Sequence, residues 1–257
     1  MSIFDALLLG LLQGLTEFLP VSSSGHLVLA QALLGVKQPG VSFEVILHLG
    51  TLFSVLIFFR ARILLLIRSL YTPTLTRERQ TVLLLILGSV PAGLVGVTLN
   101  DFFERAFSSP LLAATMLIVT ALILLSTRLV RNGKDAVNWK TAIVIGIGQS
   151  LAIMPGISRS GTTIAAGILS KIDPMEAAEF SFLLAIPAIG GAAMLKSSEL
   201  MHLPSALLWP YVIGALVSFL SGLLAVYLVM GAVKRGRFDY FAYYCFAAGA
   251  VGIYLYL

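Results

Sequence analysis

The chain has 257 residues, of which 58% are hydrophobic and 11% are charged, and its formal net charge is +5. Soluble domains carry about a quarter charged residues. The few charges here could not cover so apolar a core, which excludes a soluble globular protein and a disordered one. The basic residues lie in short loops between apolar runs, as orientation signals do in membrane proteins, so nucleic acid is excluded as a partner.

The first apolar region, residues 3–35, is interrupted by Pro20 and by the run Ser22-Ser23-Ser24-Gly25. A second region, residues 141–170, is interrupted by Ser158-Arg159-Ser160-Gly161. The pieces after the breaks are too short to cross a bilayer, because a crossing needs roughly 20 apolar residues. Both regions are predicted to be re-entrant helical hairpins, whose irregular backbone must be buried in protein or line a polar cavity.

The remaining apolar runs are each long enough to cross a bilayer. They are residues 42–60, 81–99, 110–130, 177–195, 207–231 and 238–257. Most of the 17 basic residues fall in alternate loops, which the positive-inside rule assigns to the cytoplasm. The sequence predicts an all-α polytopic membrane protein in which the first hairpin enters from outside, the second enters from the cytoplasm, and both termini lie outside.

The two interrupted regions match each other in sequence. The match pairs Gly10 with Gly146, Gln13 with Gln149, Ser22 with Ser158, Ser24 with Ser160, and Gly25 with Gly161. Each half of a single membrane domain, residues 1–257, then holds one hairpin and three spans: repeat one covers about 1–130 and repeat two about 141–257. An odd number of crossings inverts the second copy, and such inverted-topology repeats place their broken helices face to face at the membrane midplane. We therefore expect the two breaks to meet.

Half-helices that begin after Ser22 and Ser158 would point unpaired N–H groups and positive dipole ends at one place, which favours an anion. Arg159 adds a planar fork suited to phosphate oxygens, and an arginine at membrane depth is costly enough to indicate function. Hydroxyl donors and closely approaching backbone complete the predicted binding set, which also includes Gln13, Ser24, Gly25, Ser160, Gly161 and Thr163. In the alternative interpretation, Ser22 and Ser158 only cap their helices.

Of the two interrupted regions, only the first contains acid, hydroxyl and imidazole groups together. Gln13 and Glu17 are four residues apart and share a helix face. His26 follows Ser23 by three residues, close enough for a hydroxyl–imidazole hydrogen bond in a helix. Ser23, His26 and Glu17 are therefore predicted to form a nucleophile, base and orienter set.

Other polar residues are given structural interpretations. His48 lies in an apolar run and is predicted to be structural, and His202 is predicted to be a solvated loop residue. Glu44 and Glu179 each follow a hairpin, and we expect them to tie their spans to the hairpin backbone.

Two segments resemble the signature motifs of a known family. Residues 13–26 are similar to (Glu/Gln)-x-x-x-Glu running into Pro-Val-Ser-Ser-x-Gly-His, and residues 155–163 are similar to Pro-Gly-x-Ser-Arg-Ser-x-x-Thr. These are the motifs of the bacterial undecaprenyl-pyrophosphate phosphatases linked to bacitracin resistance, and the resemblance covers essentially the whole chain. Gln13 takes the amide option of the first motif, which puts in doubt any mechanism that needs two carboxylates there.

The resemblance implies an enzyme of the bacterial cytoplasmic (inner) membrane, with its site facing the periplasm. It would remove the terminal phosphate of undecaprenyl pyrophosphate, a polyprenyl lipid, and return the monophosphate carrier to peptidoglycan and envelope polymer synthesis. The family's functional positions fall on Glu17, Ser22, Ser23, His26, Ser158, Arg159, Ser160 and Thr163. A divalent cation, Mg²⁺ or Ca²⁺, would be held by Glu17 and phosphate oxygens. Membrane lipid is the other partner, and a homodimer is possible.

Three alternatives stay open at this point. Ser23 is the preferred nucleophile with His26 as its base, but His26 or a water molecule could attack instead. Arg159 with the hydroxyls of Ser158 and Ser160 would hold the pyrophosphate and stabilise charge during in-line transfer. A lipid-phosphate flippase or transporter is the rival function, because inverted repeats with broken helices are also transporter architecture.

Overall fold

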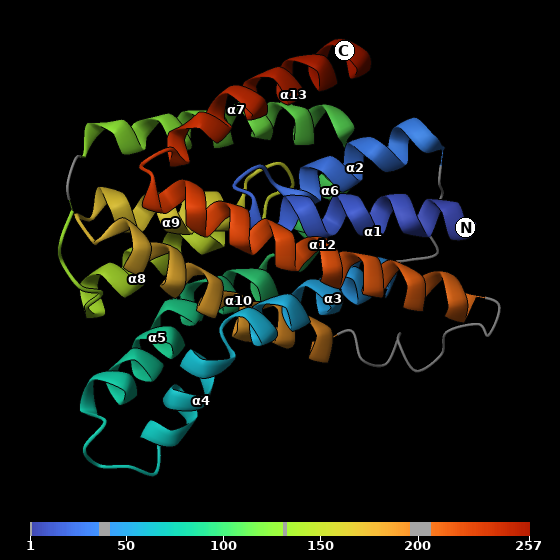
Figure 1. Cartoon of the computed structure of the whole chain (residues 1–257). Helices are drawn as coiled ribbons and strands as arrows, with labels where there is room; N and C mark the ends of the chain where they lie inside the picture. The colour runs from blue at the N-terminus through green and yellow to red at the C-terminus, as the bar shows by residue number, and fades with distance from the viewer. Residues whose placement is uncertain (1, 36–41, 131–132, 196–206) are drawn as a thin grey trace.

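The computed structural model describes residues 2–35, 42–130, 133–195 and 207–257, and these form helices without any strand. The first half contains α1 (Ile3–Phe18), α2 (Ser23–Leu34), α3 (Ser42–Phe58), α4 (Arg60–Ser69), α5 (Thr76–Thr98), α6 (Asn100–Phe107), α7 (Pro110–Ser126) and the short 3-10 helix η1 (Thr127–Leu129). The second half contains α8 (Trp139–Leu151), α9 (Arg159–Leu169), α10 (Pro174–Leu195), α12 (Leu208–Lys234), η3 (Phe238–Tyr240) and α13 (Phe241–Tyr256). Figure 1 shows the helices gathered in one bundle, with α4 and α5 extending away from it together. The all-α prediction is confirmed.

The predicted breaks and helix ends follow from local side-chain chemistry. Ser2 and Asp5 form a reciprocal capping box at the start of α1, and Asn138 forms another with Thr141 at the start of α8. The chain leaves α1 at Leu19 and resumes a helix at Ser23, whereas it leaves α8 at Ala152 and resumes at Arg159. Both interrupted regions are therefore pairs of helices separated by a short non-helical turn, as predicted.

The predicted crossing helices are present, but they differ in length. Four segments are long and apolar enough to cross a membrane alone: α5, α7 continued by η1, α10 and α12. Helix α3 reaches that length only with α4, from which it bends by 78°, and α13 has 16 residues. Helix length and composition therefore give four or five crossings among the described residues, fewer than the six predicted.

Matched glycines place the two halves against each other in the same way. Gly10 of α1 lies against Gly214 of α12, so closely that a Cβ on Gly10 would lie 2.5 Å from the Gly214 carbonyl oxygen. Gly146, the sequence match of Gly10, lies against Gly88 of α5, and its Cβ would collide with the Gly88 carbonyl. The first helix of each interrupted pair thus packs on the second long helix of the other half.

These glycine contacts make a stability prediction. We expect Gly10→Ala and Gly146→Ala each to lower the free energy of unfolding by about 1–3 kcal/mol, because overpacking forces the helices apart. Gly190→Ala is the control, since nothing lies within 4 Å of a Cβ placed there. The measurement is the thermal unfolding midpoint in detergent. Equal midpoints for all three variants would contradict the proposed close approach.

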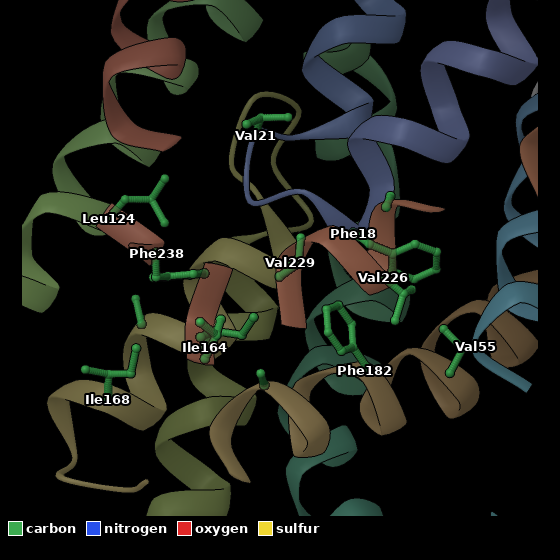
Figure 2. Close-up of a cluster of buried hydrophobic side chains, with 14 of the residues drawn as sticks. Phe18, Val21, Val55, Leu124, Ile164, Ile168, Phe182, Val226, Val229 and Phe238 are labelled. Carbon is green, nitrogen blue, oxygen red and sulfur yellow. The ribbon is translucent and has the colours of Figure 1, made fainter. Parts of the chain in front are cut away.

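The largest apolar core lies directly beside the first break. Phe18, the last residue of α1, packs edge-on against Phe182 of α10, with ring centroids 5.7 Å apart. Figure 2 shows Val226 of α12 next to this pair and Ile164 of α9 further along the same cluster. The core therefore anchors the residue that follows Glu17, and it fixes the end of α1 relative to α9 and α10.

Candidate active site

The two breaks meet, as predicted. The Ser160 hydroxyl of the second break donates to the Leu19 carbonyl of the first at 3.3 Å. Gly25 lies against Gly156, where a Cβ on Gly25 would be 2.8 Å from the Gly156 Cα. Gly156 has a φ of 95°, which glycine adopts without strain. Small residues therefore allow the two turns to come together at the centre of the bundle.

Each half-helix is capped by its own serine. The Ser22 hydroxyl accepts from the Gly25 N–H at 3.2 Å, and the Ser158 hydroxyl accepts from the Gly161 N–H at 3.0 Å. Matching hydroxyl pairs join Ser22 to Ser24 at 3.2 Å and Ser158 to Ser160 at 3.3 Å. The capping interpretation therefore describes Ser22 and Ser158 correctly. Both side chains also face the cavity described below, so capping and ligand binding do not exclude each other here.

Glu17 lies at the centre of the site. Its Oε2 accepts from the Ser23 hydroxyl at 2.6 Å and from the Gln13 amide at 3.0 Å. Its Oε1 accepts from Arg159 Nη2 at 2.6 Å. The side chains of Glu17 and Arg159 are 6% and 14% exposed, so this is a largely buried ion pair that joins the two halves. A serine hydroxyl is thereby held against a carboxylate beside a guanidinium group.

A cavity of about 300 Å³ opens over this cluster. Its polar wall consists of Glu17, Ser22, Ser23, Ser24, Glu44, His48, Ser158 and Arg159. Its apolar wall comes largely from α10, with Ala188, Ile189, Ala192 and Ala193, and includes Phe107, Ile153 and Ile157. A charged group and an attached apolar chain would both find complementary surface there.

The remaining predicted binding residues support this wall from behind. Thr163 donates to the Arg159 carbonyl at 2.7 Å and lies against the Ser181 hydroxyl, which fixes the first turn of α9. The N–H groups of Gly25 and Gly161 donate to the capping hydroxyls of Ser22 and Ser158. The Gln13 amide donates to Glu17 and so orients its carboxylate. These residues and Ser160 hold the site in place and are not among those that line the cavity.

The predicted Ser23–His26 hydrogen bond is wrong. His26 Nδ1 bonds the Ser22 carbonyl at 2.8 Å, and Nε2 bonds the Tyr244 hydroxyl at 2.8 Å. Ser23 begins α2 and turns back across the break to Glu17, whereas the His26 ring turns toward α13. Both ring nitrogens of His26 therefore bond groups other than Ser23. The Ser23 hydroxyl donates its hydrogen bond to Glu17 instead.

His48 is a cavity residue that the sequence analysis did not predict. It lines the cavity, and its Nε2 lies 3.5 Å from Glu17 Oε2, while Nδ1 bonds the Glu44 carbonyl at 2.7 Å. A signal was present, because a histidine inside an apolar helix at membrane depth is costly and marks a polar site. The structural interpretation of His48 is therefore incomplete. His202 lies outside the described residues.

The expectation for the two matched glutamates also needs correction. Glu44 accepts from the side chain of Gln31 in α2 at 3.1 Å, so it reaches the first hairpin through a side chain and not through the backbone. Glu179 accepts from Arg62 of α4 at 2.7 Å. The bend after α3 brings Arg62 to α10, which the repeat alone could not predict.

The residues around Glu17 offer few ligands for a divalent cation. Among the described residues, no group of three or more His, Cys, Asp or Glu side chains converges on one point. Both Glu17 oxygens already accept from protein donors, and Glu44 is the other carboxylate in the cavity wall. The arrangement does not fit a cation held by protein ligands alone. It fits one that keeps phosphate oxygens and water as most of its ligands, as Mg²⁺ usually does.

The fold and the site together define a multi-pass helical membrane protein with a buried polar centre, in which a serine, a carboxylate and an arginine meet where two half-helices begin. Comparison with known families gives a match over residues 6–251 to the family described as "Bacitracin resistance protein BacA". The chain belongs to this family.

Curated relatives resemble the chain over nearly its whole length. A protein of Syntrophotalea carbinolica is 45% identical, with 98% of each chain covered. One from Carboxydothermus hydrogenoformans is 41% identical, with 97% of this chain and 95% of the relative covered, and one from Salinibacter ruber is 40% identical, with 99% and 100% covered. Each of these relatives is named "Undecaprenyl-diphosphatase".

Proposed function

We propose that this protein hydrolyses undecaprenyl pyrophosphate to undecaprenyl phosphate and inorganic phosphate. The observation that carries the proposal is the Ser23 hydroxyl, which donates at 2.6 Å to a carboxylate that is itself paired with Arg159. The names of the relatives support the same substrate. The product is the lipid carrier for peptidoglycan synthesis, and its recycling accounts for bacitracin resistance.

Ser23 is the proposed nucleophile and Glu17 its base. Glu17 takes the Ser23 proton while the serine oxygen attacks the terminal phosphorus, and the bond from phosphorus to the bridging oxygen breaks. Undecaprenyl phosphate leaves, and water then cleaves the phosphoserine to release inorganic phosphate. This replaces the predicted base, His26, because His26 does not contact Ser23.

Arg159 and the cavity hydroxyls are proposed to hold the pyrophosphate. The guanidinium and the hydroxyls of Ser22, Ser24 and Ser158 face the cavity, so they can stabilise charge on the transferred group. In the free protein Arg159 is paired with Glu17, and incoming phosphate oxygens would share that guanidinium. The apolar wall of α10 would receive the first part of the prenyl chain.

A divalent cation, Mg²⁺ or Ca²⁺, is proposed to arrive with the pyrophosphate, with Glu17 as its protein ligand. It would neutralise part of the diphosphate charge. The limited number of protein carboxylates at the site supports a cation that binds with substrate. Binding measured by calorimetry should accordingly be weak without substrate.

The proposed topology has six crossings and two re-entrant hairpins in a single inverted-repeat domain, residues 1–257. The packing between the two halves supports this topology. Helix α1 of the first half packs on α12 of the second, and α8 of the second half packs on α5 of the first. The distribution of basic residues among the loops supports a site that faces the periplasmic side of the inner membrane. Association into a homodimer stays a prediction. A flippase or transporter is not favoured, because Glu17 and Ser23 occur in only one half and the relatives are named as diphosphatases.

The direct test is phosphate release by purified protein from undecaprenyl pyrophosphate, with and without chelator. We expect one phosphate per lipid, a loss of activity with chelator, and acid-stable phosphate trapped on Ser23 when the reaction is quenched. An acid-labile adduct on His26 would overturn the assigned nucleophile. No release by folded protein in the presence of Mg²⁺ or Ca²⁺ would overturn the proposed function.

A further inference from the structure

Ser22, which precedes the proposed nucleophile, has an unusual backbone conformation. Its φ is 70° and its ψ is 95°, a region that residues with a Cβ rarely adopt. Among the described residues only Lys171 shares a positive φ without being glycine. Strained residues persist where their surroundings hold them in place. The question is which group holds Ser22.

The second half provides an internal comparison. Ser158, the match of Ser22, has an ordinary φ of −74° and ψ of 120°. Thr162 stands where the first half has His26, and its buried hydroxyl has no hydrogen-bond partner. Thus the strained serine and the histidine occur together in one repeat, and neither occurs in the other. This co-occurrence points to His26 as the group that stabilises the Ser22 conformation.

The partners of His26 fix its tautomer. The Ser22 carbonyl can only accept, so Nδ1 carries the proton in this 2.8 Å contact. In the neutral ring Nε2 then accepts from the Tyr244 hydroxyl, also at 2.8 Å. The two rings are nearly parallel, at 11°, with centroids 5.5 Å apart. The Ser22 carbonyl therefore sets the tautomer of His26, and Tyr244 holds the plane of its ring through Nε2.

We propose that Tyr244 is a positioning residue for the phosphatase reaction. Through His26 it holds the Ser22 carbonyl, and this keeps Ser23 turned toward Glu17. Neither Tyr244 nor His26 lines the cavity, so neither is expected to touch the reacting phosphate. Tyr244 is about half exposed, so Tyr244→Phe is expected to keep the packing of the bundle. This proposal rests on the proposed function for the reaction that Ser23 performs, whereas the contacts that position Ser23 do not depend on it.

The kinetic test uses Tyr244→Phe, which keeps the stacked ring and removes the hydroxyl. We expect kcat to fall about tenfold, the effect of one hydrogen bond, with KM unchanged because phosphate contacts remain. Tyr243→Phe is the matched control, since Tyr243 lies on the same helix but its hydroxyl accepts from Arg128 of η1. In a His26→Ala background, Tyr244→Phe should cause no further loss.

A second measurement does not depend on activity. The chain has 3 histidines, so nitrogen-15 histidine NMR can follow His26 after assignment with His48→Gln and His202→Gln. The wild-type protein should show the Nδ1–H tautomer at His26 with an Nε2 resonance shifted by the hydrogen bond from Tyr244, and Tyr244→Phe should lose that Nε2 shift. If the wild-type protein releases no phosphate, the proposed function fails, while the Nε2 shift still decides whether Tyr244 holds His26.

Three results would overturn the proposal. They are a wild-type kcat in Tyr244→Phe, an unchanged His26 Nε2 resonance in that variant, or a loss in kcat that adds fully to that of His26→Ala. Full additivity would mean that the two residues act independently, as they would in simple packing.

Discussion

Replacing Glu17 by glutamine is expected to lower the turnover of undecaprenyl pyrophosphate by about 10²- to 10⁴-fold. Glutamine has the same shape, so it can still accept from Ser23 or Arg159. It cannot take the Ser23 proton, which the carboxylate receives across 2.6 Å. The loss should therefore fall on kcat, and it should also abolish the phosphoserine trapped in the wild-type protein.

Glu179→Gln is the matched control for this variant. Glu179 is a membrane glutamate that is also paired with an arginine, but its partner is Arg62, it does not line the cavity, and the partly exposed contact is worth about 1 kcal/mol or less. Its turnover should equal that of the wild-type protein. Phosphate release and the unfolding midpoint are measured together on both variants. Near-normal turnover in folded Glu17→Gln would assign the base to another residue.

The meeting of the two breaks could be predicted because it depends on the internal repeat. The matched residues Ser22 and Ser158 indicated related halves, and an odd number of crossings inverts the second copy. From this the closeness of Glu17 and Arg159 followed, although the two lie far apart in the chain. Long-range symmetry in the sequence thus carried the most important contact of the site.

The His26 contacts could not be predicted in the same way. Spacing places Ser23 and His26 on neighbouring positions of one helix, but Ser23 is the first helical residue and turns back to Glu17. The partner that orients His26 is Tyr244, 218 positions later in the chain. His26 and Tyr244 have no counterpart pair in the other half, so the internal repeat could not predict their contact. Helix periodicity could not predict it either, because it describes only contacts within one helix.

The apolar run 42–60 was predicted nearly to its ends, since α3 spans Ser42–Phe58. What hydropathy did not predict is the bend of 78° that follows Phe58 and leads into α4. After that bend Arg62 pairs with Glu179 of α10. Hydropathy reports that a segment is apolar, whereas the direction of the next segment and its contacts with a distant helix depend on tertiary structure.

Removal of Arg159 tests the other half of the site. Arg159→Ala is expected to lower kcat/KM by about 10³-fold, because the guanidinium is the only cationic side chain among the described residues that line the cavity. It should also lower the free energy of unfolding by about 3–5 kcal/mol, since Glu17 is left as an unpaired buried charge. Arg62→Ala, which breaks the ion pair with Glu179, is the control and should keep full activity.

The double variant Glu17→Gln/Arg159→Ala separates catalysis from folding. It contains neither charge, so its unfolding midpoint should return toward that of the wild-type protein, because the destabilisation of Arg159→Ala comes from the lone carboxylate. Its turnover should stay below that of either single variant. Added guanidinium should partly restore phosphate release to Arg159→Ala, which keeps Glu17, and should restore none to the double variant. A stable but active double variant would show that the ion pair only joins the two halves and takes no part in phosphate cleavage.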